Sequence, residues 1–105
     1  MVIVETAVFT KRIQQLLTAE QYRHFQHHLV NYPESGAVIP GGGGLRKVRW
    51  MQSGRGKRGG IRVIYYWANT RDRLLMLFAY PKTEQDDLTP EQLRLLKRII
   101  EEEYP

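Results

Sequence analysis

The sequence has no cysteine among its 105 residues, which excludes disulfides and thiolate chemistry. It also has no long hydrophobic run. The longest, LLMLFAY at residues 74–80, is far shorter than the roughly 20 residues of a membrane-spanning helix. At the N-terminus, MVIVETAVF meets Glu5 too early for the core of a signal peptide. We therefore expect a soluble, cytoplasmic protein that does not associate with membranes.

Acidic residues are missing from the middle of the chain. Between Glu34 and Asp72 there is no Asp or Glu, yet eight of the 16 Lys and Arg residues lie there. The formal net charge of +5 favours a polyanionic partner such as nucleic acid, or an acidic protein. Seven of the 11 acidic residues lie in the last 22 positions. We therefore expect the basic middle and the acidic end to form two different surfaces.

The length and the 42% hydrophobic content fit a single domain covering residues 1–105. Hydrophobic spacing and capping residues predict strands at 1–5, 45–51, 61–68 and 73–80, and helices at 8–17, from Thr18 to before Pro33, and from Thr89 onward. The order β-α-α-β-β-β-α predicts an α+β fold. We expect an N-terminal helical hairpin and a C-terminal helix on one face of a small, mostly antiparallel sheet whose other face is partly open.

The segment NYPESGAVIPGGGG at residues 31–44 is predicted to be an irregular connector. It contains two prolines and five glycines, which disfavour both helix and strand.

A loop of glycines and basic residues, GRGKRGG at 54–60, separates two predicted strands. It is not a nucleotide-binding phosphate loop, because that motif needs Ser or Thr after the lysine and then a helix, whereas Arg58 and a strand follow Lys57. A solvated turn that only carries charge is one interpretation. The absence of nearby acids and the presence of Arg62 inside the apolar run IRVIYY favour a surface that binds phosphate.

Residue alternation along strands predicts which of these cations lie together. Arg62 shares a strand face with Ile64 and Tyr66, and Lys47 shares one with Arg49. A strand register that brings Lys47, Arg49 and Arg62 onto one open face is available and would form a cationic surface suited to a phosphate backbone.

Three histidines lie close together on the second predicted helix. His24 and His28 are four residues apart, a spacing that can chelate a metal, but no acidic third ligand is near in the sequence. We expect a solvated helix face and no metal site.

The chain resembles the RelE/ParE superfamily of bacterial toxins, and most closely its HigB-like branch. The resemblance depends on three segments in order, GGLRKVRW, GRGKRGGIRVIYYW and LFAYPKTEQDDLTPEQ, and covers nearly the whole chain. It implies the toxin of a type II toxin–antitoxin system. The implied activity is a ribosome-dependent endoribonuclease that cleaves mRNA in the A site without a metal or another cofactor, by activating the ribose 2′-hydroxyl against the adjacent phosphate.

The same resemblance implies residue roles and partners. Arg62 matches the family arginine that binds the transition-state phosphate. Where the best-studied branch has an arginine and then a tyrosine after the last strand, this chain has Thr83 and no tyrosine before Tyr104, so Tyr80 and Lys82 are the nearest substitutes. The implied catalytic residues are Lys57, Arg62, Tyr80 and Lys82, and the implied RNA-binding residues are Arg46, Lys47, Arg49, Arg55 and Arg58. The implied partners are the ribosome, mRNA and a small DNA-binding antitoxin, with DNA contacted only through the antitoxin complex.

Two other functions remain open on the residues alone. A ParE-like protein on the same scaffold would inhibit DNA gyrase and leave mRNA intact. A plain RNA-binding module would need the same cations, because phosphate contacts alone give salt-dependent affinity. A strand-terminal tyrosine such as Tyr80 is also common as a packing residue with a solvated hydroxyl.

Overall fold

The computed structural model describes residues 1–51 and 60–104 and has the predicted α+β architecture. The elements follow the order β1 (Val2–Glu5), α1 (Ala7–Leu16), α2 (Ala19–Asn31), β2 (Ala37–Val38), β3 (Leu45–Trp50), β4 (Ile61–Ala68), β5 (Arg73–Pro81) and α3 (Pro90–Glu103). A short 3₁₀ turn, η2 (Asn69–Arg71), links β4 to β5. Within the described ranges, no helix is long and apolar enough to span a membrane.

Side-chain caps define where the helices begin. The Thr18 hydroxyl accepts a hydrogen bond from the Gln21 amide, and the Gln21 side chain accepts one from the Thr18 amide. Thr89 and Gln92 make the same reciprocal pair at the start of α3, where Pro90 occupies the first turn. Such pairs satisfy amides that have no partner inside the helix. Both starts predicted from these residues are confirmed.

The sheet has five strands in the order β1-β5-β4-β3-β2, with β1 parallel to β5 and the other pairs antiparallel. The prediction that residues 31–44 form no strand is wrong, because Ala37 pairs with Lys47 and Val38 with Arg46. Ala37 and Val38 lie between Gly36 and Pro40, but neither of them is a glycine or a proline. A pair of consecutive residues with ordinary backbone freedom is enough to add a short edge strand.

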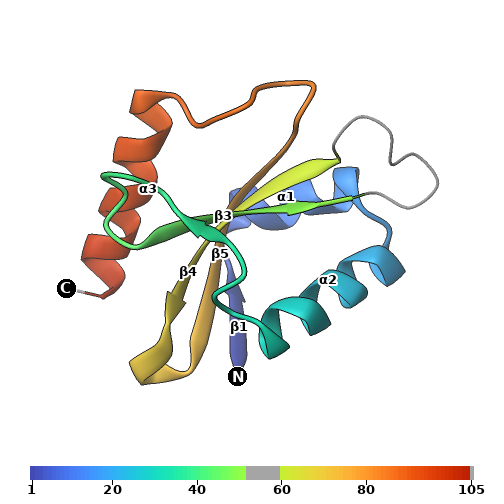
Figure 1. Ribbon diagram of the computed structural model, residues 1–105, viewed down its shortest axis with the longest axis horizontal. Coiled ribbons are helices and arrows are strands. Elements are labelled where there is room, and N and C mark those ends of the chain that lie inside the picture. Colours follow the sequence, from blue (N-terminus) through green and yellow to red (C-terminus); the bar gives the residue numbers. More distant parts are fainter. Residues whose placement is uncertain (52–59, 105) are drawn as a thin grey trace.

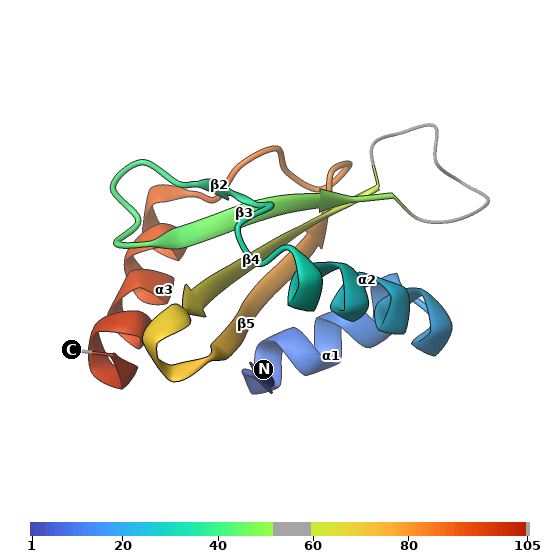
Figure 2. The same ribbon diagram turned by 60° about the horizontal axis from the view of Figure 1, so that its bottom comes forward.

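Helices cover both faces of the sheet, not one face as the sequence predicted (Figures 1 and 2). One cluster joins α1 and α2 to the sheet and includes Phe9, Phe25 and Val63. A second cluster on the opposite face joins α3 to the sheet through Leu96 and Ile100. The alternating strand residues are apolar on both sides of β4 and β5, so each face needs a covering layer.

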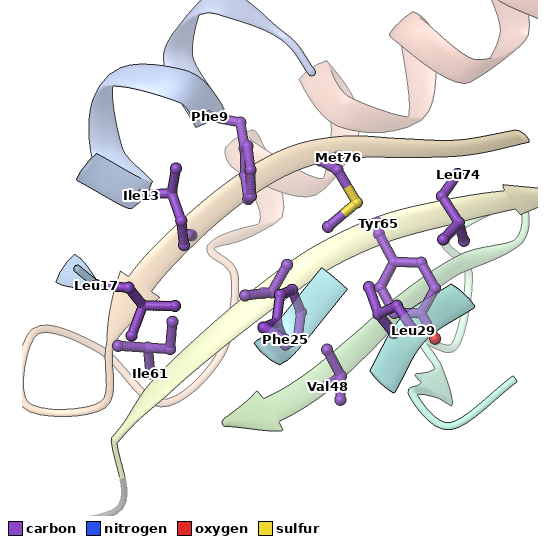
Figure 3. Close-up of a cluster of buried hydrophobic side chains, with 12 residues drawn as sticks. Phe9, Ile13, Leu17, Phe25, Leu29, Val48, Ile61, Tyr65, Leu74 and Met76 are labelled. Carbon is purple, nitrogen blue, oxygen red and sulfur yellow. The ribbon is translucent and has the colours of Figure 1, made fainter. Parts of the chain in front are cut away.

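The larger cluster packs the two helices of the hairpin, α1 and α2, against the sheet (Figure 3). Its fully or almost fully buried members come from both helices, from the residue that follows α1, and from all three long strands: Phe9, Ile13, Leu17, Phe25, Leu29, Val48, Ile61, Val63, Tyr65, Leu74, Met76 and Ala79. The spacing of Phe9 and Ile13, and of Phe25 and Leu29, puts each pair on one helix face, as predicted.

Tyr65 ties the connector after α2 to the middle of the sheet. Its buried hydroxyl donates to the Pro33 carbonyl oxygen at 2.6 Å and accepts from the Gly36 amide at 2.9 Å. A Cβ atom at position 36 would lie only 2.8 Å from the Tyr65 ring, so glycine is needed for this close approach. The tyrosine therefore sets the path of the chain into β2.

Replacing Tyr65 with phenylalanine should lower the free energy of unfolding by about 2 kcal/mol, because a buried amide and a buried carbonyl lose their partner. Urea unfolding measures this change. The matched control is Tyr32→Phe, which removes a hydroxyl from an exposed ring and should change the unfolding free energy by less than about 0.5 kcal/mol. Equal effects of the two substitutions would contradict a structural role for the Tyr65 hydroxyl.

Candidate functional site

A row of three polar side chains crosses β3, β4 and β5 on the face that carries α3. Arg49 pairs directly with Arg62, and Arg62 pairs directly with Tyr80. Paired residues in an antiparallel ladder point to the same side of the sheet, with Cβ atoms about 4.5–5.5 Å apart. We call Arg49, Arg62 and Tyr80 the basic row.

Lys47 lies on the same face, two residues before Arg49 on β3. The register that would bring Lys47, Arg49 and Arg62 together is therefore the one that the structure has. Two of these cations reach water, since Arg49 is exposed and the Lys47 side chain is 25% exposed.

Arg46, which the family resemblance implied to be an RNA-binding residue, lies on the other face of β3. Strand alternation turns it to the opposite face, where its Nη1 donates to the carbonyl oxygens of Glu34 at 3.2 Å and Gly36 at 2.8 Å. Its guanidinium group is thus engaged in holding the connector that leads into β2. This geometry favours a structural role for Arg46 over contact with RNA.

Arg62 is the one charged residue that is buried in the described part of the chain, with 5% of its surface exposed. Its Nη1 donates to the Ile61 carbonyl oxygen at 3.3 Å. Its charge acts at the sheet surface with less solvent screening than that of an exposed residue.

Tyr80 is fully buried in the cluster under α3, and its hydroxyl donates to the Asp86 carbonyl oxygen at 3.3 Å. Burial raises the pKa of this phenol to about 12, the Asp87 carboxylate adds to the rise, and the Arg62 charge opposes it. The phenol therefore stays protonated at neutral pH. Its position fits packing and anchoring of the segment after β5 better than it fits the role of a base.

In the segment that follows β5, one carboxylate reaches the face that carries the basic row, so the acidic end and the basic middle meet at this point, where the sequence analysis expected two different surfaces. Asp87 Oδ1 accepts a short hydrogen bond from Lys47 Nζ in an ion pair. Glu84 forms a two-point ion pair with Arg12 of α1, with distances of 3.3 and 3.0 Å. The Arg12 guanidinium in turn lies 4.9 Å from the centroid of the Phe78 ring.

Lys47 and Arg62 both act on the Asp87 carboxylate. The hydrogen bond from Lys47 and the charge of Lys47 lower the pKa of Asp87 below its ordinary value, and the charge of Arg62 acts in the same direction. Asp87 is thus ionised at neutral pH and lies within electrostatic range of both cations. Asp87 was not predicted as a site residue. The available signal was the acidic pair Asp86 and Asp87, which lies six and seven residues after Tyr80.

A groove of about 400 Å³ borders this ion pair, and Lys47 and Asp87 are part of its wall. Its remaining lining is mostly apolar and comes from the connector, from the segment before α3 and from α3 itself: Ala37, Val38, Ile39, Pro40, Leu88 and Leu93. A second groove of about 430 Å³ lies between α1, β5 and α3, with Val8, Phe78 and Leu95 in its wall. That second groove contains none of the predicted site residues.

Lys82 lies at the end of the sheet next to the basic row. It follows β5 directly, and its amide donates to the Gly60 carbonyl oxygen at 3.0 Å. Gly60 has a positive φ of 59°, and a Cβ atom there would lie 2.2 Å from the Trp50 carbonyl oxygen, so this tight approach of β3 and β4 requires glycine. Lys82 is exposed. The predicted residues Arg55, Lys57 and Arg58 lie outside the described residues.

Of the three histidines of α2, His24 and His27 are exposed and His28 packs against aromatic rings. The His28 ring lies 5.4 Å from the Tyr32 ring and 5.2 Å from the Trp50 ring, measured between centroids. In the described ranges, no group of three or more His, Cys, Asp or Glu residues is arranged to hold a metal ion.

Comparison with known proteins identifies relatives of most of the chain. The family model described as "RelE toxin of RelE / RelB toxin-antitoxin system" matches residues 30–103, which is more than half of the chain. The match contains β2 to β5 and all of α3. It leaves out β1, α1 and all but the last two residues of α2. Among solved structures, the crystal structure of the intact E. coli RelBE toxin–antitoxin complex contains a similar chain, with a TM-score of 0.59 and 13% identity over 76% of this chain and 94% of that one. At this identity the similarity establishes the fold.

Proposed function

The chain belongs to the RelE toxin family, and from this premise we propose that it is a ribosome-dependent endoribonuclease that cleaves mRNA in the A site and stops translation. The observation that carries the proposal is the basic row with Lys47 beside it on one face of the sheet. The glycine-rich basic loop in the sequence supports placement in the HigB-like branch. A cognate antitoxin is the proposed protein partner, in line with the family description.

The proposed reaction is an attack of the ribose 2′-oxygen on the adjacent phosphorus. The new 2′-O–P bond forms as the bond from phosphorus to the 5′-oxygen of the next nucleotide breaks. One proton leaves the 2′-hydroxyl and one reaches the departing 5′-oxygen, which gives a 2′,3′-cyclic phosphate and a free 5′-hydroxyl. Negative charge increases on the phosphorane oxygens, so cations that are already in place lower the barrier.

Arg62 is the residue proposed to bind the phosphorane. It is held by the sheet on both sides, and its planar guanidinium group can donate two parallel hydrogen bonds to phosphate oxygens. Its burial makes the charge more effective at short range than that of an exposed arginine. Lys47 and Arg49 are more exposed and are proposed to bind neighbouring phosphates of the strand.

Two residues near the end of β5, Tyr80 and Lys82, are candidates for proton transfer. The Tyr80 hydroxyl has a pKa of about 12 and already donates to the Asp86 carbonyl, so we assign Tyr80 to positioning of the loop. Lys82 is exposed beside the open end of the sheet and can approach a bound strand. We propose Lys82, together with Lys57 of the adjoining loop, as the source of acid–base catalysis.

Tyr80→Phe tests this assignment. The substitution should reduce the cleavage rate by less than about fivefold, because it removes an anchoring hydrogen bond worth roughly 0.5–1.5 kcal/mol and no reacting proton. Lys82→Met should reduce the rate by about 100-fold, within the range of general acid–base catalysis. Initial cleavage rates on one defined mRNA measure both. A cleavage rate at least 100-fold lower in Tyr80→Phe, with an unchanged melting temperature, would assign proton transfer to Tyr80.

The decisive experiment for the function is a cell-free bacterial translation reaction with a defined mRNA. New 5′ ends are mapped by primer extension with and without ribosomes, and a parallel reaction measures gyrase supercoiling. The proposal expects cuts that follow the reading frame, that require ribosomes and that leave supercoiling unaffected. Intact mRNA with inhibited supercoiling would favour a gyrase inhibitor, and intact mRNA with salt-dependent RNA binding would favour a binding module.

A further inference from the structure

The Lys47–Asp87 pair joins the face that carries the basic row to the acidic segment in the free protein. Asp87 is on an exposed stretch, with 75% of its side chain accessible to solvent, whereas Lys47 is only 25% accessible. The carboxylate therefore covers a cation that the proposed function needs for RNA. The interaction belongs to the binding face itself and not to the hydrophobic core.

The backbone that carries Asp87 is held independently of this ion pair. Gln85 Nε2 donates to the Asp87 carbonyl oxygen and to Gln92 Oε1, each at 2.8 Å. The Tyr80 hydroxyl holds the Asp86 carbonyl, and Glu84 binds Arg12. A change confined to the Asp87 carboxylate should therefore alter charge at the row and leave the path of the segment in place.

A carboxylate is a close chemical substitute for a phosphate oxygen pair. Both are anionic acceptors that form charge-assisted hydrogen bonds with ammonium and guanidinium groups. Asp87 makes such a bond with Lys47, and its carboxylate is also close enough to Arg62 to interact with that charge. An RNA phosphate at Lys47 would meet the same donor and the same neighbouring cation.

We propose that Asp87 occupies the place of an RNA phosphate at Lys47 in the free protein, and that RNA binds by displacing this carboxylate. The inference rests on the proposed function. It assigns Asp87 as a specificity-determining residue. A short RNA that only replaces Asp87 as the partner of Lys47 gains little affinity, because one ion pair is lost for the one that forms. An RNA strand that also reaches Arg49 and Arg62 gains enough to displace the carboxylate.

Binding of a single-stranded RNA oligonucleotide tests the proposal apart from catalysis. The probe is a fluorescently labelled oligonucleotide with 2′-O-methyl groups throughout, which cannot undergo attack by a 2′-hydroxyl. Fluorescence anisotropy gives its Kd at several salt concentrations from about 50 to 200 mM, the range in which phosphate contacts respond strongly to salt. The proteins are the wild type, Asp87→Asn, Asp87→Glu and Asp86→Asn.

Asp87→Asn should bind about three- to fivefold more tightly at low salt, as expected for release of one exposed ion pair. Its plot of log Kd against log salt should be steeper than that of the wild type, because the exposed Lys47–Asp87 ion pair that RNA must break in the wild type weakens as salt rises. Asp87→Glu keeps the carboxylate and should stay within twofold of the wild type. Asp86→Asn is the matched control, because it removes the same charge one residue away, where the Asp86 side chain makes no hydrogen bond or ion pair with the described residues. It should change the affinity by less than twofold.

The outcomes separate this inference from the proposed function. Equal gains for Asp86→Asn and Asp87→Asn would overturn the displacement of Asp87 and leave RNA binding intact, since the gain would reflect net charge alone. An unchanged salt slope in Asp87→Asn would overturn it as well. Tighter binding by Asp87→Asn, with Asp87→Glu and Asp86→Asn close to the wild type, would support it. No binding by any of the four proteins would overturn the inference alone, since the proposed cleavage requires the ribosome and is tested by the cell-free translation reaction.

Discussion

Arg62→Ala is expected to lower the rate of mRNA cleavage by about 100-fold or more, the loss typical for removal of a preorganised group that stabilises transition-state charge. Arg62 is the central member of the basic row, paired with Arg49 on one side and Tyr80 on the other. No other described cation is both buried and on this face. The measurement is the initial rate at which new 5′ ends appear in a translation reaction on one defined mRNA.

Two further variants make the Arg62 result specific. Arg62→Lys keeps the charge but loses the planar pair of donors, so its cleavage rate should fall by an intermediate amount, about tenfold. Arg73→Ala makes the same chemical change at an exposed position at the start of β5, where Arg73 pairs with Ala68 at the far end of the strands. It should cleave within twofold of the wild type. Equal rates for Arg73→Ala and Arg62→Ala would contradict the assignment.

Burial of Arg62 requires a stability control. Removing a buried side chain leaves space among its neighbours, which lowers stability whatever the residue does in catalysis. Thermal unfolding of each variant, followed by circular dichroism, shows whether the folded fraction at the assay temperature is unchanged. Loss of cleavage in Arg62→Ala with a folded fraction above nine-tenths would be a loss of chemistry and not of fold.

Local patterns predicted the helices and long strands because the information lies within a few residues. The helical spacing of Phe25 and Leu29, and the caps at Thr18 and Thr89, act within one or two turns. The apolar runs of β4 and β5 are long enough to specify strands without knowledge of their neighbours. For the same reason strand alternation indicated correctly that Lys47 and Arg49 share a face.

Features that depend on contacts between distant segments could not be predicted in this way. The short strand β2 exists because Ala37 and Val38 find partners on β3, which local composition does not reveal. The side of the sheet that α3 covers depends on the long segment between β5 and α3. Arg46 looked like another phosphate-binding residue until the connector was seen to supply two carbonyl acceptors.

The candidate site shows the same division. The residues of the basic row could be selected from the sequence, since strand position and charge are local properties. Asp87 could not, because its meaning depends on a contact across 40 positions of the chain. An acidic segment at the end of a basic chain suggests a separate surface, but opposite charges also attract one another when the fold brings them close. The structure pairs the two regions at Lys47 and Asp87.

Phe25→Ala is expected to reduce the free energy of unfolding by about 3–5 kcal/mol, the range for removal of a fully buried aromatic side chain. The Phe25 ring is completely buried in the larger cluster, and its centroid lies 5.1 Å from that of Trp50, the last residue of β3. Small domains have only about 5–15 kcal/mol in total. Urea unfolding should therefore show a midpoint shifted to much lower concentration. Tyr32→Ala, at an exposed ring just after α2, should cost less than about 1 kcal/mol.

The milder variant Phe25→Leu connects this core to the basic row. It should cost about 1–2 kcal/mol and leave most molecules folded. Phe25 packs on the face of the sheet opposite to Arg62, so a folded Phe25→Leu protein should cleave mRNA within about threefold of the wild type. Arg62→Lys should show the reverse pattern, with little change in unfolding and a clear loss of cleavage. A folded Phe25→Leu protein that lost as much cleavage as Arg62→Lys would contradict this expectation. The change in the core would then reach Arg49 through Trp50 at the end of β3, and the two faces would not be independent.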